Sequence, residues 1–323
     1  MYDARQLMST GQVIALAEPG MSYWPLLLGI ASAALTMGSG MNGAVSQRIG
    51  IFPGVLIYLT VGSLCSVLGL LLFPEARFAP HLLLRQPPGV FLPGLFNLGV
   101  IAAQLRILRA AGVAALTGGI FVGQALTGIV LDKFGFLGQP AIALTWRRLL
   151  GVGLAFLGLQ VLLRSRAASE PRSGSSWAWA GLAIAVGAVM GMFADLNARL
   201  GEAIGLTGAT FLFLFPGALL LTAAALVGAL TVNAPFMRTL PLRYLLIPGA
   251  ANFSLIFVQN RTVTLIGVGA SVAIAVVFQM TSALVIDAFG WFRLVRRDIR
   301  WSQVIGLLVM LGGVLLMYAT ALT

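Results

Sequence analysis

Ionisable and redox-active side chains are scarce in this chain of 323 residues. Charged residues make up only 9% of it, with a single cysteine, Cys65, and a single histidine, His81. One cysteine excludes an internal disulfide framework, and one histidine beside it leaves no ligand cluster for zinc. A phosphate-binding loop of the form GxxxxGK[ST] is also missing from the sequence. We therefore expect no metal or other cofactor and no ATP hydrolysis by this chain.

Apolar residues take up most of what remains. They make up 59% of the chain, and the mean hydropathy is +0.99. A soluble domain of this composition could not cover itself with a polar surface. The chain lacks the period-two alternation of a membrane barrel, so helices about 18 or more residues long are expected to cross the bilayer. Ten segments qualify: 25–44, 54–73, 89–108, 113–131, 145–164, 178–198, 208–230, 243–260, 264–286 and 303–322.

Identical polar residues recur at a fixed spacing of 155 positions. Leucines would match by chance in so apolar a chain, but amides and charged residues would not. The spacing predicts one unit written twice. Because each unit holds five helices, an odd number, the two copies would enter the membrane from opposite sides as inverted repeats. The pairs are Asn42 and Asn197, Asn97 and Asn252, Gln104 and Gln259, Arg106 and Arg261, Gln124 and Gln279, and Asp132 and Asp287.

The predicted fold is an all-α integral membrane protein of ten transmembrane helices. The only polar stretch long enough to separate two bundles is 164–176, which reads RSRAASEPRSGSS. We expect an N-terminal tail at 1–21, a first repeat at 22–166, a linker at 167–176 and a second repeat at 177–323.

Basic residues outnumber acidic ones, which gives a formal charge of +11, and they are spread over nearly every loop. No basic patch with interleaved aromatic residues occurs, so nucleic-acid binding is not expected. Twelve basic residues fall on the face opposite the two termini and eight on the termini's own face. The positive-inside rule then places both termini outside, mainly through the loop 293–300.

Polar residues at membrane depth usually face a cavity or one another, because a charge or amide in hydrocarbon costs free energy. Asn97 and Gln104 are seven residues apart on one helix face, just after Pro93 and Gly94. The second copy repeats this pattern with Asn252 and Gln259 after Pro248-Gly249. Proline-interrupted helices at matching positions predict a binding site. The alternative is that these amides join helices to one another by hydrogen bonds.

Gln124 and Gln279 sit among small residues, and Gly119 and Gly123 form a GxxxG pattern. Such residues let helices approach closely, so packing competes here with substrate contact. Arg106 and Arg261 close their helices in both copies, two positions after the paired glutamines, and are candidates for coupling or gating. The alternative is that each arginine extends to the lipid headgroups.

Asp132 and Asp287 each begin an Asp-x-Phe-Gly segment at a helix end. They serve either to close a loop or to gate. A carboxylate near a helix C-terminus opposes the helix dipole, so a nearby cation is expected. The candidates are Arg147 or Arg148 for the first copy and Arg293 or Arg296 for the second.

Asp195 breaks the repeat, because Gly40 stands at the matching position. A carboxylate here could couple transport to protons or to a cation. It could equally pair with Arg199, one helical turn away.

Ten helices in two copies, with GQALTGIVLDKFG after the fourth and FQMTSALVIDAFG after the ninth, resemble the drug/metabolite transporter superfamily, in particular its YdcZ-like bacterial branch. The resemblance implies an alternating-access carrier whose cavity is lined by helices one, three, four, six, eight and nine. It places in or near that cavity Asn42, Asn97, Gln104, Gln124, Asn197, Asn252, Gln259 and Gln279. The related small multidrug exporters use a glutamate in their first helix, and no glutamate lies between Trp24 and Ala44 here.

These observations favour a secondary transporter of a small polar or amphiphilic metabolite in the bacterial inner membrane, as a monomer or homodimer. A proton or an exchanged solute would drive it. An enzyme is not expected, since His81 has no serine and acid to form a catalytic set with. The alternative is a lipid-handling, flippase-like protein or a structural membrane protein.

Overall fold

The computed structural model describes residues 23–72, 78–135, 145–167, 177–230, 240–291 and 299–319, and these residues form helices without strands. The predicted tail 1–21 and all of the predicted linker except Ala167 lie outside them. The α-helices are α2 (Trp24–Ile49), α3 (Ile51–Leu72), α4 (Leu92–Phe134), α5 (Trp146–Ala167), α6 (Trp177–Ile204), α7 (Leu206–Leu226), α9 (Leu242–Ile266), α10 (Val268–Phe289) and α11 (Trp301–Ala319). Two short 3-10 helices, η2 (Pro80–Arg85) and η3 (Pro88–Phe91), precede α4.

Six helices in the described part of the chain are long and apolar enough to cross a membrane: α2, α3, α6, α7, α9 and α10. Shorter apolar segments occupy Pro88–Gln104 and Trp301–Gly313. Large hydrophobic side chains such as Leu71, Leu226 and Leu308 point outward from the bundle. An apolar exterior of this kind suits contact with lipid and not with water.

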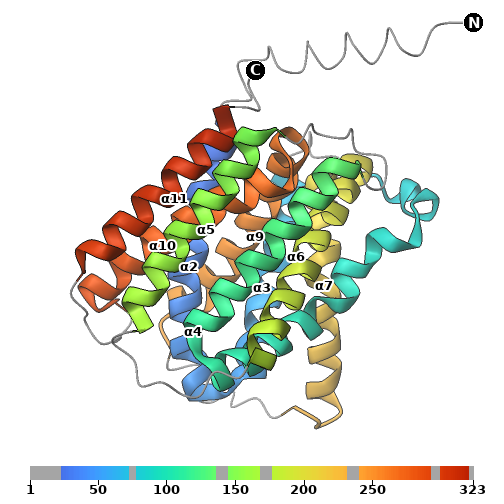
Figure 1. The fold of residues 1–323 in the computed structure, drawn as a ribbon. Helices are drawn as coiled ribbons and strands as arrows, with labels where there is room; N and C mark the ends of the chain where they lie inside the picture. The colour runs from blue at the N-terminus through green and yellow to red at the C-terminus, as the bar shows by residue number, and fades with distance from the viewer. Residues whose placement is uncertain are drawn as a thin grey trace, which may run out of the picture.

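The predicted helices 89–108 and 113–131 are joined in one α-helix, α4. Gln104 and Gln124 line the same cavity, although 20 residues of straight helix would separate them by about 30 Å. Ile107 and Leu116 also meet in one hydrophobic cluster. The path of α4 therefore turns back on itself, as Figure 1 shows. In the second copy the corresponding break is sharp, and Gly267, with a φ of 85°, separates α9 from α10.

Backbone conformation repeats along with the sequence. Gly50, between α2 and α3, and Gly205, between α6 and α7, both have a φ of 96°. Gly135 and Gly290 end α4 and α10 in the left-handed region, at 57° and 62°. Only glycine takes such angles without strain. The 155-residue duplication thus includes the bends between helices.

Helices α3 and α7, which are counterparts in the two copies, make reciprocal contacts. Leu214 packs at Gly62, and the equivalent Leu59 packs at Gly217. Farther along, Gly69 lies against Thr207. The matched positions run in opposite directions, so α3 and α7 cross antiparallel.

Helices α5 and α11 are the second pair of counterparts that pack on each other, and they lie side by side in Figure 1. Gly158 lies against the backbone of Gly306, and the equivalent Gly313 lies against the backbone of Gly151. Small residues at a crossing let the two backbones come close. This pair is antiparallel as well. Each contact has an equivalent in which the two copies swap roles, as in a symmetric dimer interface.

Candidate functional site

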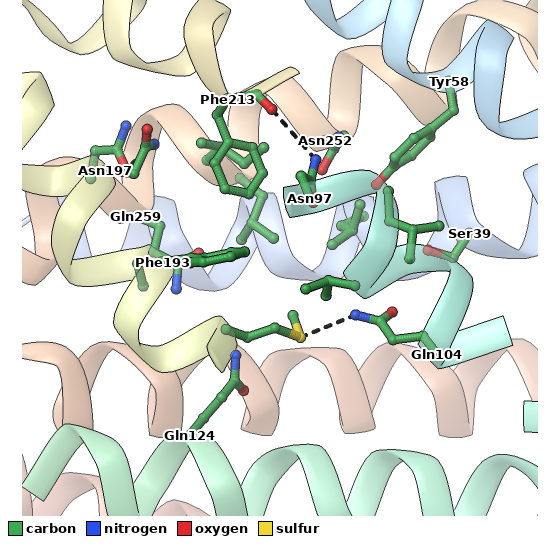
Figure 2. Close-up of a pocket in the computed structure, with 18 residues that line it drawn as sticks. Ser39, Tyr58, Asn97, Gln104, Gln124, Phe193, Asn197, Phe213, Asn252 and Gln259 are labelled. Carbon is green, nitrogen blue, oxygen red and sulfur yellow. Dashed lines mark hydrogen bonds between the residues drawn. The ribbon is translucent and has the colours of Figure 1, made fainter. Parts of the chain in front are cut away.

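A cavity of about 250 Å³ lies where α2, α3, α4, α6, α7 and α9 meet (Figure 2). It is lined by Leu35, Ser39, Tyr58, Asn97, Val100, Ile101, Gln104, Gln124, Met190, Phe193, Ala194, Asn197, Phe213, Asn252, Leu255, Ile256, Gln259 and Asn260. Helices α3 and α7, which the resemblance did not include, contribute Tyr58 and Phe213. Helix α10, which it did include, contributes none of these residues.

Most of the lining consists of repeat-equivalent positions. Seven pairs separated by 155 residues face the cavity from the two copies: Leu35 and Met190, Ser39 and Ala194, Tyr58 and Phe213, Asn97 and Asn252, Val100 and Leu255, Ile101 and Ile256, and Gln104 and Gln259. The cavity is therefore built from the same surface of both repeats.

Asn97 and Asn252 are both buried, each with 7% of its surface exposed. The Asn97 Nδ2 donates a 3.5 Å hydrogen bond to the carbonyl oxygen of Phe213 on α7. The adjacent glycines bring these helices together, because a side chain at Gly94 would collide with the Leu212 carbonyl and one at Gly249 with the backbone of Tyr58. The two Pro-Gly pairs thus set the helix contacts that place the asparagines in the cavity.

Gln104 and Gln259 also reach the cavity from α4 and α9. The Gln104 Nε2 donates to the Met190 Sδ at 3.1 Å, as Figure 2 shows. Met190 is the equivalent of Leu35, so this contact exists on one side only. Amides of the two copies therefore occupy matching places with different surroundings.

Gln124 lines the cavity, but its equivalent Gln279 on α10 does not. The GxxxG glycines beside Gln124 pack on α6, with Gly119 against Ala183 and Gly123 against the backbone at Ile184. The first glutamine thus belongs to the cavity, and its neighbours have the expected packing role.

The departure from the repeat at Phe278, the equivalent of Gly123, has a counterpart on the facing helix. Phe278 lies over Gly29 on α2, and Gly29 is the equivalent of Ile184. The first copy supplies the glycine in both contacts, Gly29 and Gly123, and the second copy supplies the larger residue in both, Phe278 and Ile184.

Asn197 lines the cavity, whereas its equivalent Asn42 lies near Gly54 at the elbow between α2 and α3. The Asn197 Nδ2 donates to the Asn260 Oδ1 at 2.8 Å, and the Asn260 Nδ2 donates to the Thr210 Oγ1 at 3.4 Å. All three side chains are buried.

Sequence reasoning missed Asn260 and Thr210 because Leu105 and Val55 stand at the equivalent positions, so neither gives a repeat signal. It also missed Ser39, Tyr58, Phe193 and Phe213. Their hydroxyl and aromatic groups stand out little in an apolar chain.

Asp195 is buried on α6, with 4% exposed, and does not line the cavity. The Arg199 Nε donates to its Oδ2 at 3.0 Å, which confirms the pairing expected one helical turn apart. Glu202, near the end of α6, interacts electrostatically with Arg261 and Arg199. In the described part of the chain, no group of three His, Cys, Asp or Glu side chains could hold a metal ion.

Asp132 accepts backbone hydrogen bonds from Val268 at 3.1 Å and Gly269 at 3.4 Å, and so caps the start of α10. Arg148 lies 3.7 Å from its carboxylate, so the expected cation is present in the first copy. Arg147 instead lies over the Trp146 ring. An anion suits a helix N-terminus, which explains a position that is unfavourable when α4 is considered alone.

The remaining candidates fall away from the cavity or outside the described residues. Arg106 and Arg261 are exposed and do not line it. The side chain of Asp287 and the arginines Arg293 and Arg296 lie outside the described residues.

Comparison with known proteins agrees with this architecture. The family model DMT_YdcZ, described as "Putative inner membrane exporter, YdcZ", matches residues 23–161 and again 178–316, which are offset by the same 155 residues. A solved structure titled "Crystal structure of protein" is 16% identical and superposes with a TM-score of 0.65, covering 93% of this chain and 96% of that chain. No curated protein matches. The chain belongs to the YdcZ family of the drug/metabolite transporters, as a two-repeat, multi-pass membrane transporter of the inner membrane.

Proposed function

We propose that the protein is an alternating-access secondary transporter that carries a small polar or amphiphilic metabolite through the cavity between its repeats. One observation carries the proposal: the cavity is lined by seven repeat-equivalent pairs. Secondary transporters bind their substrates where two structural repeats meet, and rock the repeats about that site. No covalent chemistry is needed, and no enzyme activity is proposed.

Inverted repeats within ten spans are part of this proposal. The antiparallel crossing of α3 with α7 and of α5 with α11 supports it, because each pair consists of counterparts from the two copies. Counterparts that cross antiparallel are what two copies of opposite orientation produce.

A difference between the two ends of the cavity supports alternating access. One end lies beside the C-terminal part of α6 and is called the α6 end; there Asn197, Asn260 and Thr210 form a hydrogen-bonded chain. Beside it is a packed hydrophobic cluster of Val90, Leu196, Leu200, Ile204 and Ala209.

At the α2 end, a second cavity of about 160 Å³ separates α2 from the start of α9. Val45 lines this cavity, and its equivalent Leu200 is inside the packed cluster of the other end. Such an arrangement fits a carrier that is closed at the α6 end and looser at the α2 end.

Reconstituted protein tests the function. Proteoliposomes would be offered a mixed bacterial metabolite extract, with and without a pH gradient, and internal solutes measured by mass spectrometry. We expect saturable flux of at least one small polar solute, weakened by Asn252→Ala in the cavity and unaffected by Gln160→Ala on α5. Lipid scrambling without saturable solute flux would favour the lipid-handling alternative and contradict the proposal.

A further inference from the structure

Among the residues that the structure describes, those lining the cavity have uncharged side chains. The lining contains no aspartate, glutamate, lysine, arginine or histidine among the described residues. Half of it is polar, through nine hydroxyl and amide groups: Ser39, Tyr58, Asn97, Gln104, Gln124, Asn197, Asn252, Gln259 and Asn260. The other half offers aliphatic, thioether and aromatic surface.

The charged side chains of α6 nearest the cavity are paired with each other. Asp195 and Arg199, on the same turns of α6 as Asn197, form an ion pair at 3.0 Å, so their charges cancel locally. The start of α10, whose dipole could attract an anion, is occupied by the carboxylate of Asp132. Among the residues that the structure describes, neither the lining nor this helix end offers a counter-ion to a solute in the cavity.

An ionised solute would therefore lose its hydration without a compensating partner. Burying a charge is costly unless it is paired, whereas a neutral polar group needs only hydrogen bonds. The cavity supplies those bonds but no charge. This favours uncharged solutes over their ionised analogues of the same size.

The hydrogen-bonding capacity left in the cavity belongs mainly to amides. Within the described part of the chain, Gln124, Asn252 and Gln259 make no side-chain hydrogen bond to protein. Each amide has a donor group and an acceptor group side by side. Their natural complement is a solute edge that also carries both, such as a carboxamide or a ring lactam.

Aromatic rings bound the same space. Tyr58 and Phe213 lie on either side of Asn97 and Asn252 in Figure 2, and Phe193 adds a third ring near Gln259. Ligand sites commonly combine apolar and aromatic walls with a few polar groups that fix orientation. A flat ring can rest against such walls while its polar edge meets the amides.

We propose that this cavity takes an uncharged ring compound with an amide-type edge and discriminates against ionised analogues. The inference rests on the proposed function of the cavity as the substrate site.

Thermal unfolding of the full chain in lipid nanodiscs tests the selectivity. The probes are nicotinamide, its anionic analogue nicotinate and its cationic analogue 3-(aminomethyl)pyridine, at matched ionic strength. A second pair is uracil and the anion orotate. We expect saturable stabilisation by at least one neutral probe, and binding at least about tenfold weaker for its ionised analogues. Stabilisation by neither neutral probe, or equal or tighter binding of an ion, would overturn the proposal.

A charge placed in the cavity should invert the preference. Gln259→Glu adds one carboxylate to the lining and should favour the cationic probe over nicotinamide by at least about tenfold. Gln124→Glu is a second variant in case the first fails to fold. Gln86→Glu, just after η2 and outside the cavity, makes the same change and should leave the preference for the neutral probe intact. An unchanged preference in folded cavity variants would count against the assignment.

Flux measurements separate this inference from the proposed function. Stabilisation by a neutral probe without flux of any solute would remove the transport proposal and leave the selectivity standing. Saturable flux of ions, with no binding of neutral probes, would remove the selectivity inference and leave the transport proposal standing.

Discussion

At the scale of single residues, Asn260 joins three helices through one amide. It accepts from Asn197 and donates to Thr210, with 2% of its own surface exposed. Asn260→Leu installs the residue found at the equivalent position Leu105 and leaves the buried Asn197 Nδ2 without its acceptor, while the Thr210 hydroxyl keeps only its bond to the Leu206 carbonyl. We expect a loss of about 1–3 kcal/mol in unfolding free energy, because an unsatisfied buried group costs its desolvation. Thermal unfolding in detergent would measure it, and an unchanged midpoint would show that the chain of amides is not structural.

Asp195 belongs to the same scale. Its buried ion pair with Arg199 suggests a structural role, since removing one partner leaves an unpaired charge. We expect Asp195→Asn to destabilise the protein by about 3 kcal/mol while the response of flux to a pH gradient persists. The double variant Asp195→Asn/Arg199→Gln should recover much of the stability. Loss of the pH-gradient response in a folded Asp195→Asn protein would instead assign proton coupling to this carboxylate.

At the scale of helices, glycine positions in one element differ in what they contact. A side chain at Gly158 would collide with the backbone of α11, whereas one at Gly153, also on α5, would meet nothing within 4 Å. Gly158→Ala should cost roughly 1–3 kcal/mol, because the crossing cannot widen without losing contacts. Gly153→Ala should be neutral or slightly stabilising, since alanine favours a helix more than glycine does. Equal unfolding midpoints for the two variants would contradict the close packing of α5 on α11.

Sequence alone predicted most of the helices, because the length and position of each apolar segment directly indicate a membrane-spanning helix. The spans at α2, α3, α6, α7 and α9 differ from prediction mainly at their ends. The sequence predicted two helices, 89–108 and 113–131, and did not predict that the residues between them would continue as helix in α4.

The candidate site was predicted where both copies carry the same polar residue, as at Asn97 and Asn252. Repetition was also the limit of this reasoning. It gave equal weight to Gln124 and Gln279, although only the first lines the cavity, and it gave no signal for Asn260. Helix packing decides which member of a pair faces inward, and packing depends on residues such as Gly29 and Phe278 that carry no polar signature.

At the scale of the whole molecule, the two ends of the cavity should differ in reactivity. Cys65 is the only cysteine, so a Cys65→Ser background allows single reporters. Tyr244→Cys at the α2 end should react quickly with a membrane-impermeant maleimide, and Leu200→Cys in the packed cluster should react slowly. A transported solute should change the two rates in opposite directions. Rates that move together, or not at all, would argue against alternating exposure.

Two contacts between the halves of the chain pair a glycine of the first half with a larger residue of the second: Gly29 with Phe278, and Gly123 with Ile184. These contacts determine which halves can assemble with each other. Two copies of the first half, assembled with each other, would set Gly29 against Gly123 and leave a void. Two copies of the second would set Ile184 against Phe278 and crowd the crossing. Each half is therefore shaped to fit the other and not itself. Expressed as separate polypeptides, the halves should co-purify as a one-to-one pair, and neither should form a stable dimer alone.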